Sequence, residues 1–191
     1  MAPIILHSDF PGIHVAPATL DLASAEVDLF NAMGREYALR EALDDGTRGA
    51  YDYILIDCPP SLNLLTINSL SAADAILVPL QCEFFALEGL SQLIKTVERV
   101  RTNLNPRLTI QGVVLTMFDR RNNLSEQVAE DVRSVLGDKV YQTVIPRNVR
   151  ISEAPSHGKP VLLYDNACVG SQAYIRLASE IIRRERELRA A

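Results

Sequence analysis

Apolar and polar residues alternate in blocks along the chain. Short continuous apolar runs predict strands, and they lie at 13–16, 53–57, 75–79, 108–117 and 140–145. Apolar residues that recur every three or four positions predict helices at 20–43, with a break near Gly34, and at 62–72, 87–104, 124–136 and 171–188. Strands that alternate with helices predict an α/β fold in which a mostly parallel sheet has helices on both faces.

One domain accounts for the whole pattern. The runs 53–56 and 75–78 are almost continuously apolar, as expected for strands that are buried on both faces. No internal repeat, low-complexity linker or second type of composition divides the 191 residues. A chain of this length can bury one sizeable core, so we expect a single domain over residues 1–191.

Composition and charge narrow the functional classes. The chain is 48% apolar and 23% charged, and its net charge of −5 argues against wholesale electrostatic binding to DNA or to a membrane. No apolar run approaches the roughly 18 residues of a membrane span, and the N-terminus lacks the pattern of a signal peptide. We therefore expect a cytoplasmic protein with no membrane attachment.

Cysteines and histidines give no sign of a metal site or a disulfide framework. Cys58, Cys82 and Cys168 are widely spaced, without a Cys-x-x-Cys pair, which favours three buried and reduced thiols. The three histidines, at positions 7, 14 and 157, also lack the spacing of metal ligands. The sequence thus predicts no zinc site.

Polar residues follow the predicted parallel strands at their ends. Asp57 closes the run 53–57, and the prolines that come next prevent the strand from continuing. Ligands of open parallel sheets lie beyond such carboxyl ends, and in nucleotide-handling folds an acid there faces hydrated Mg²⁺. The plainer alternative is that the acid caps the next helix. Polar groups also follow the later runs, at Gln81, Glu83, Asp119, Arg120 and Pro146-Arg147-Asn148.

Four segments carry a family resemblance when they are taken in order. They are Tyr53-Ile-Leu-Ile-Asp-Cys-Pro-Pro-Ser61, Val78-Pro-Leu-Gln-Cys-Glu-Phe-Phe-Ala-Leu-Glu-Gly-Leu-Ser91, Leu115-Thr-Met-Phe-Asp119 and Val144-Ile-Pro-Arg-Asn-Val-Arg-Ile-Ser-Glu-Ala-Pro-Ser-His-Gly-Lys-Pro160. From about Ala16 to the last helix, the chain resembles the ParA/Soj chromosome- and plasmid-partition ATPases, members of the deviant P-loop group that contains MinD. The resemblance implies a P-loop NTPase-like fold, with ATP and Mg²⁺ as cofactors and ATP hydrolysis as the activity.

The same resemblance gives roles to individual residues. Asp57 takes the place of the Walker B acid, the catalytic carboxylate that holds Mg²⁺ through water. The segment Pro146-Arg147-Asn148 would line the adenine side of the nucleotide pocket, and Met117 and Phe118 would lie near that pocket.

Partition ATPases of this family form ATP-dependent homodimers, work with a ParB-like partner protein and bind DNA without sequence preference, which would place the chain on the nucleoid. The candidate phosphate contacts in this sequence are basic residues, Arg120, Arg121, Arg147, Arg150 and Lys159. A solvated positive face is the simpler interpretation of any single one of them. The chain departs from the family at Tyr164-Asp-Asn-Ala-Cys-Val-Gly170, where basic residues are common in the family and this segment has none.

The phosphate loop of the family is missing from this sequence. Such a loop reads Gly-x-x-x-x-Gly-Lys-Ser/Thr, and none of the nine glycines fits, since the one Gly-Lys pair, at 158–159, is followed by Pro160. Family members carry the loop after their first strand. We therefore expect the C-terminal portion of such a domain, without that strand, its loop and the first helix, and no ATP hydrolysis by this chain alone.

Two other interpretations stay open. The chain is alternatively a non-enzymatic relative that serves as a binding or regulatory module. A metabolic dinucleotide-binding enzyme is less favoured, because no Gly-x-Gly-x-x-Gly follows any predicted strand.

Overall fold

The computed structural model describes residues 4–44, 46–59, 61 and 63–190, and the chain forms two compact units. Unit 1 comprises Met1–Asp74 and Lys95–Thr109, and unit 2 comprises Ala75–Ile94 and Ile110–Ala191. The sequence-based expectation of a single domain stays a prediction.

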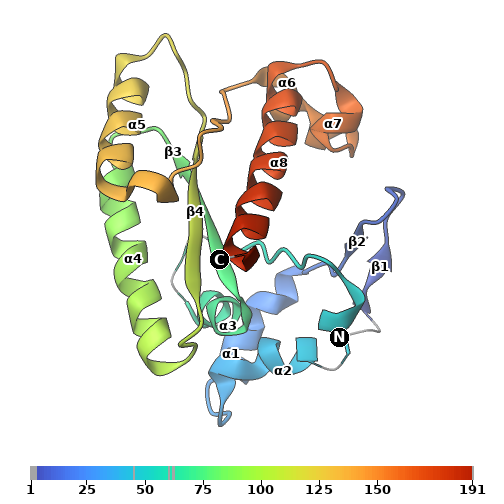
Figure 1. Ribbon diagram of the computed structural model, residues 1–191. Coiled ribbons are helices and arrows are strands. Elements are labelled where there is room, and N and C mark those ends of the chain that lie inside the picture. Colours follow the sequence, from blue (N-terminus) through green and yellow to red (C-terminus); the bar gives the residue numbers. More distant parts are fainter. Residues whose placement is uncertain (1–3, 45, 60, 62, 191) are drawn as a thin grey trace. The chain divides into compact units, whose positions relative to one another are not determined.

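Unit 2 is built on the strands β3 (Ala75–Gln81) and β4 (Thr109–Thr116), which pair in a two-stranded sheet (Figure 1). The helix α4 (Ala86–Asn103) connects them, as a parallel pair requires. At the carboxyl end of the sheet, the Cys82 N–H donates to the Thr116 carbonyl at 3.2 Å. These elements confirm the strands predicted at 75–79 and 108–117 and the helix predicted at 87–104.

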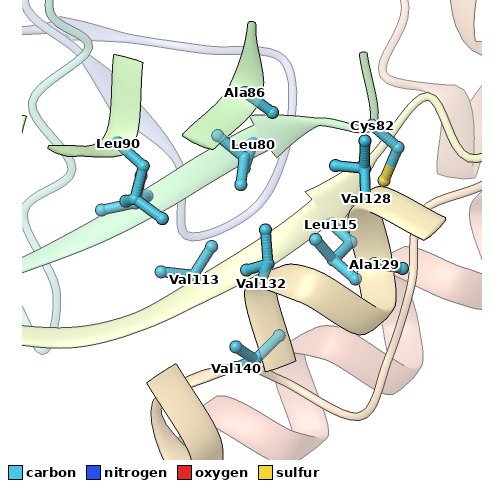
Figure 2. Close-up of a cluster of buried hydrophobic side chains, with 11 residues drawn as sticks. Leu80, Cys82, Ala86, Leu90, Val113, Leu115, Val128, Ala129, Val132 and Val140 are labelled. Atoms are coloured by element: carbon cyan, nitrogen blue, oxygen red, sulfur yellow. The ribbon is translucent and has the colours of Figure 1, made fainter. Parts of the chain in front are cut away.

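The helices α4 and α5 (Asn123–Leu136) cover one face of this sheet. Figure 2 shows Val128 and Val132 of α5 beside Leu115 of β4, and Leu80 of β3 beside Ala86 of α4. All of these side chains are buried in one cluster. The three- or four-residue spacing of apolar positions on each helix is what brings them together on this face.

The helix α8 (Val169–Ala190) covers the opposite face. Its Ala173 and Leu177 pack against Val114 of β4 and against Tyr141 and Ile145 of the later chain. Neighbouring residues of β4 thus point to opposite helical layers, as the two-residue period of a strand requires. The predicted fold class, a mostly parallel sheet with helices on both faces, is confirmed (Figure 1).

The strand predicted at 140–145 forms only in part. This segment runs parallel to β4 but forms only isolated bridges: Val140 pairs with Val113 of β4, and Pro146 pairs with Phe118 just beyond the strand. On its other side, two backbone N–H groups donate to the Glu180 carboxylate of α8, from Gln142 at 2.8 Å and from Thr143 at 2.9 Å. A side chain therefore satisfies donors that a neighbouring strand would otherwise have to satisfy.

Unit 1 consists mainly of short helices. The helices α2 (Ala38–Asp44) and α3 (Leu64–Ala72) are joined through Asn68, whose side chain accepts from the Leu39 N–H and donates to the Arg35 carbonyl. Gly34 has a φ of 71°, a left-handed conformation at the N-cap of the next helical turn; α1 ends before it at Asp28, which confirms the predicted break. The remaining helical turns are η2 (Leu20–Ser24), α1 (Ala25–Asp28), η3 (Arg35–Tyr37) and η4 (Arg48–Ala50).

A small hairpin precedes these helices. The strand β1 (Leu6–His7) pairs antiparallel with β2 (His14–Val15), so that Leu6 faces Val15 and His7 faces His14. The strand predicted at 13–16 is therefore present in a shortened form.

The strand predicted at 53–57 is wrong, because these residues belong to no strand. Leu55 is 89% exposed and Ile54 is 40% exposed. A strand forms only where a second strand takes up its N–H and C=O groups. No β-ladder forms with this segment in the described part of the chain, so its apolar composition alone does not make it a strand.

The remaining predicted helices agree with the structure. Those at 62–72, 124–136 and 171–188 correspond to α3, α5 and α8, although position 62 lies outside the described residues. Short helical segments between α5 and α8 are η5 (Gly137–Lys139), α6 (Val149–Glu153), η6 (Ala154–His157) and α7 (Val161–Tyr164). Across the described residues, no helix has the length and apolar character that crossing a membrane would need. Cys82 is buried as expected, whereas Cys58 is exposed, which contradicts the expectation of three buried thiols.

Candidate functional site

A cleft of about 250 Å³ opens in unit 2 where β3, β4 and the segment 140–146 end. Its lining combines apolar side chains with an amide and hydroxyl groups, as is typical of small-molecule sites. The lining residues are Pro79, Thr116, Met117, Ile145, Pro146, Asn148, Ile151, Ser152 and Tyr174. The position agrees with the rule that ligands lie beyond the carboxyl ends of parallel strands.

Met117 directly follows β4 and has an unusual conformation. Its φ is 53°, and it is the only residue other than glycine with a positive φ in the described part of the chain. Such a conformation is strained for a methionine and persists only where the surroundings hold it. Here the next residue is held on both sides: the Phe118 N–H donates to the Ile145 carbonyl at 3.2 Å, and the Phe118 carbonyl accepts from the Arg147 N–H at 3.0 Å.

Asn148 joins the cleft to α6. Its side-chain Oδ1 accepts from the Arg150 N–H at 3.0 Å and so caps the helix at its N-terminus. In the described part of the chain, no acceptor is recorded for its Nδ2 group, which leaves a hydrogen-bond donor available in the cleft lining. The cap fixes the orientation of the amide, because only Oδ1 can accept from the backbone.

Gly170 allows α8 to approach the cleft closely. A Cβ atom built at this position would lie 2.6 Å from the Ile151 side chain and 3.4 Å from the Asn148 Oδ1 atom. Any larger residue would therefore require the Ile151 side chain or α8 to move. This glycine is needed for close packing and not for its backbone conformation.

The five residues expected beside a nucleotide occupy different surroundings. Met117, Pro146 and Asn148 line the cleft, Phe118 packs partly buried against the core between the sheet and α5, and Arg147 is exposed. Sequence reasoning missed several lining residues, namely Pro79, Thr116, Ile145, Ile151, Ser152 and Tyr174. For three of them, Pro79, Thr116 and Ile145, the position near the end of a predicted strand was a signal that would have found them.

Asp57 belongs to unit 1, and the lining residues belong to unit 2. Its carboxylate is exposed, and no ion pair or hydrogen bond of this side chain is recorded in the described part of the chain. Among the described residues, no three His, Cys, Asp or Glu side chains cluster closely enough to hold a metal ion. A metal at Asp57 would therefore take its other ligands from water and from a bound phosphate.

Two of the five basic residues proposed for DNA contact are already neutralised by carboxylates. Arg121 pairs with Asp119 at 2.8 Å, and its hydrogen bonds hold the pKa of Asp119 at about 2. Arg150 pairs with Glu153 at 2.9 Å and with Asp165 at 3.5 Å.

The other three basic residues are Arg120, Arg147 and Lys159. They are exposed, and no ion pair is recorded for any of them within the described ranges. These three cations, all in unit 2, are the ones that remain free to meet a phosphate backbone.

Comparison with known proteins identifies the family. A family model described as an AAA domain matches residues 1–110. The chromosome partitioning protein ParA of Caulobacter vibrioides (strain NA1000 / CB15N) is 63% identical over 193 residues, which cover 99% of this chain and 72% of that protein. The chain belongs to the ParA/Soj family of chromosome-partitioning ATPases. The sporulation initiation inhibitor protein Soj of Bacillus subtilis (strain 168) is 54% identical over 178 residues, covering 93% of this chain and 70% of Soj.

Solved structures agree with this membership of the ParA/Soj family. Cobyrinic acid a,c-diamide synthase from Mycobacterium smegmatis is 35% identical with a TM-score of 0.79, over 95% of this chain and 66% of that one. A structure of the same synthase contains an ATP analogue and magnesium; it is 40% identical with a TM-score of 0.71, over 78% and 60% of the two chains. The chain thus spans 60–72% of the length of these relatives.

Proposed function

We propose that this chain is the adenine-binding portion of a ParA-type partition ATPase, and that the cleft of unit 2 receives the adenine of ATP. The observation that carries the proposal is the meeting of Met117, Pro146 and Asn148 in one cleft, although Pro146 and Asn148 lie 29 and 31 positions after Met117 in the chain. The family resemblance alone named these residues, and the geometry of unit 2 supports their joint role.

The cleft has the chemistry that an adenine ring needs. Apolar groups from Ile145, Pro146 and Ile151 can cover the faces of a planar base, and the ring of Tyr174 lies in the same lining. The Nδ2 group of Asn148 can donate to a ring nitrogen of the base, because its Oδ1 atom is engaged in capping α6. These groups would contact the adenine base, and the phosphates would be bound by other groups.

Asp57 is the residue proposed to hold Mg²⁺ through water. Its exposed carboxylate is the type of oxygen ligand that this ion prefers. Bound Mg²⁺ would supply charge neutralisation at the β- and γ-phosphates. Since the sequence contains no Walker A loop, hydrolysis by this chain alone is not expected.

DNA and protein partners are also part of the proposal. Arg120, Arg147 and Lys159 carry exposed charge that can contact phosphates irrespective of base sequence, and Arg121 and Arg150 would add to it only on leaving their carboxylate partners. Such binding would locate the protein in the cytoplasm, on the nucleoid. ATP-dependent dimerisation and a ParB-like partner follow from the family.

The test compares adenosine with Mg²⁺-ATP on the 191-residue chain by isothermal titration calorimetry. Mg²⁺-ATP should bind only modestly more tightly than adenosine, because the direct contacts proposed for this chain are to the base and Asp57 would reach the phosphates only through hydrated Mg²⁺. Asn148→Asp keeps the acceptor that caps α6 but removes the donor, and it should weaken both ligands about tenfold. Asn122→Asp is the matched control, because Asn122 caps α5 in the same way and lies outside the cleft lining.

Two results would overturn the proposal. Equal affinities of the wild type and Asn148→Asp would place the base elsewhere. An affinity for ATP far above that for adenosine, together with turnover that Asp57→Ala abolishes, would mean that this chain holds and cleaves the phosphates by itself.

A further inference from the structure

The hairpin at the start of unit 1 brings two histidines together. His7 on β1 and His14 on β2 are directly opposite each other in the antiparallel register. Their rings meet edge to face with centroids 4.3 Å apart, and His7 Nδ1 lies 3.0 Å from His14 Nε2. Both side chains are exposed, so an ion in solution can reach the two nitrogens.

Tyr51 prepares His14 as a ligand. Its hydroxyl group lies 2.9 Å from His14 Nδ1. When this oxygen accepts the Nδ1 proton, Nε2 keeps its lone pair and faces His7. A hydrogen bond from the second ring nitrogen to an oxygen is the usual way in which a metal-binding histidine is held in the correct tautomer.

The separation of the two nitrogens favours particular coordination geometries. Two nitrogens 3.0 Å apart, each about 2.0–2.1 Å from one metal, subtend an angle of about 94° at that metal. This is close to the 90° between neighbouring ligands in square-planar or octahedral coordination, the geometries of Cu²⁺ and Ni²⁺. A tetrahedral ion needs the nitrogens about 0.3 Å farther apart.

We propose that His7 and His14 form a binding site for a divalent transition metal of the Ni²⁺ and Cu²⁺ type. The metal replaces the proton shared between the two rings and lies beside the line that joins the nitrogens. Each exposed imidazole turns about its Cβ–Cγ bond to point at it. Because no third His, Cys, Asp or Glu joins the cluster in the described part of the chain, water completes the coordination.

Occupancy would stabilise the hairpin. Each strand has only two residues, and an isolated pair of strands is marginal in water. The turn between them is already held, since the Ser8 hydroxyl donates to the Ile13 carbonyl at 2.7 Å. A metal that joins His7 to His14, with His14 bonded to Tyr51, would add a second closure at the neighbouring residue pair of the same hairpin.

The experiment titrates the untagged 191-residue chain with NiCl₂ and follows binding by calorimetry. One Ni²⁺ should bind per chain and raise the melting temperature. His7→Gln and His14→Gln should each abolish this binding, and Tyr51→Phe should weaken it about tenfold by removing the group that orients His14. The matched control is His157→Gln, since His157 is exposed and stacks on Tyr164 in unit 2. Mg²⁺, which prefers oxygen ligands, should not bind there.

A second measurement does not depend on the variants being folded. Paramagnetic Ni²⁺ should broaden the ring NMR signals of His7 and His14 in the wild-type chain and leave those of His157 sharp. Equal broadening of all three histidines would overturn the proposal. Unchanged Ni²⁺ affinity in His7→Gln or in His14→Gln would overturn it as well.

Discussion

Replacing Glu180 by glutamine should destabilise unit 2 more than any other single loss of charge on α8. Glu180 is 6% exposed, and its two oxygens accept the N–H groups of Gln142 and Thr143. It also pairs with Arg184, whose Nη2 atom lies 2.9 Å from Oε1. Glutamine has nearly the same shape, so the substitution leaves no cavity and tests the charge and the acceptors alone.

The expected cost follows from these contacts. A hydrogen bond to a charged group contributes about 1.5–3 kcal/mol, and a buried donor without an acceptor costs about 1–3 kcal/mol. Glutamine keeps one acceptor oxygen and turns an NH₂ group toward the other N–H. Arg184 keeps its bonds to the Asp138 and Val140 carbonyls, which limits the loss. We expect Glu180→Gln to lower the free energy of unfolding by about 3 kcal/mol, out of a total of about 5–15 kcal/mol.

Urea unfolding of the 191-residue chain, followed by circular dichroism, measures this difference. Glu187→Gln is the matched control: it is the same substitution on the same helix, but Glu187 is exposed and 4.0 Å from Arg183. An exposed pair of this kind contributes about 0–1 kcal/mol. If both variants lose the same stability, the argument that Glu180 takes the place of a neighbouring strand is refuted.

The pH dependence provides an independent check. Burial raises the pKa of Glu180, but the N–H groups of Gln142 and Thr143 and the charge of Arg184 together outweigh it, so the pKa lies below its ordinary value. A carboxyl group with a depressed pKa stabilises the fold above its unfolded pKa of about 4.3, and this contribution is lost as the pH falls through the folded pKa. The stability difference between the wild type and Glu180→Gln should therefore be constant near neutral pH and shrink below about pH 4.

Three further predictions concern unit 2. Gly112→Ala should lower the free energy of unfolding in urea by about 1–3 kcal/mol, because a Cβ there would lie 2.5 Å from the buried Tyr141 ring. An unchanged stability would show that the ring has room to move. The Asp119 carboxyl should titrate by NMR at about 2, and Arg121→Ala should return its pKa toward about 3.9; a titration near 3.9 in the wild type would contradict the pairing. Arg147→Ala should reduce the steepness of log DNA affinity against log salt concentration by about 0.9, whereas Arg121→Ala should leave this slope nearly unchanged. Equal effects of the two variants on the slope would contradict the distinction between free and paired arginines.

The amphipathic helices and the buried strands were predictable because their signal is local. In α5, the four-residue spacing of Val128, Val132 and Leu136 decides the helix and its buried face together. The apolar run of β3 is equally clear, and its partner β4 lies one crossover helix further along the chain. The segment 53–57 has the same local signal, but a strand also needs a partner for its backbone, and composition cannot report whether one is present.

The lining of the cleft could be predicted from the sequence only in part. Met117, Pro146 and Asn148 were all named because the segments that contain them match the family. Tyr174 lies on α8, and no spacing in the sequence connects it with a strand end. The positive φ of Met117 was also unforeseen, since it arises from hydrogen bonds of the next residue to chain far away in sequence.

The proximity of His7 and His14 could not be predicted from the sequence either. Positions 7 and 14 lack the usual spacing of metal ligands, and sequence reasoning set them aside. A six-residue connection and antiparallel pairing nevertheless place them directly opposite each other. Spacing rules describe ligands that share one helix or one loop, and a cross-strand pair depends on register, which the sequence of a two-residue strand hardly specifies.

The segment 140–148 is where the fold and the proposed site depend on each other. On one side its backbone bonds to β4 and Phe118, and on the other Glu180 of α8 holds it. The cleft residues Ile145, Pro146 and Asn148 follow within six residues of the Glu180 contacts. Because a short chain fixed at one end transmits displacement to the other, the position of Asn148 depends on α8 as well as on its own cap. A substitution on α8 is therefore expected to change the proposed affinity of the cleft for adenine, even at a position that does not contact the base.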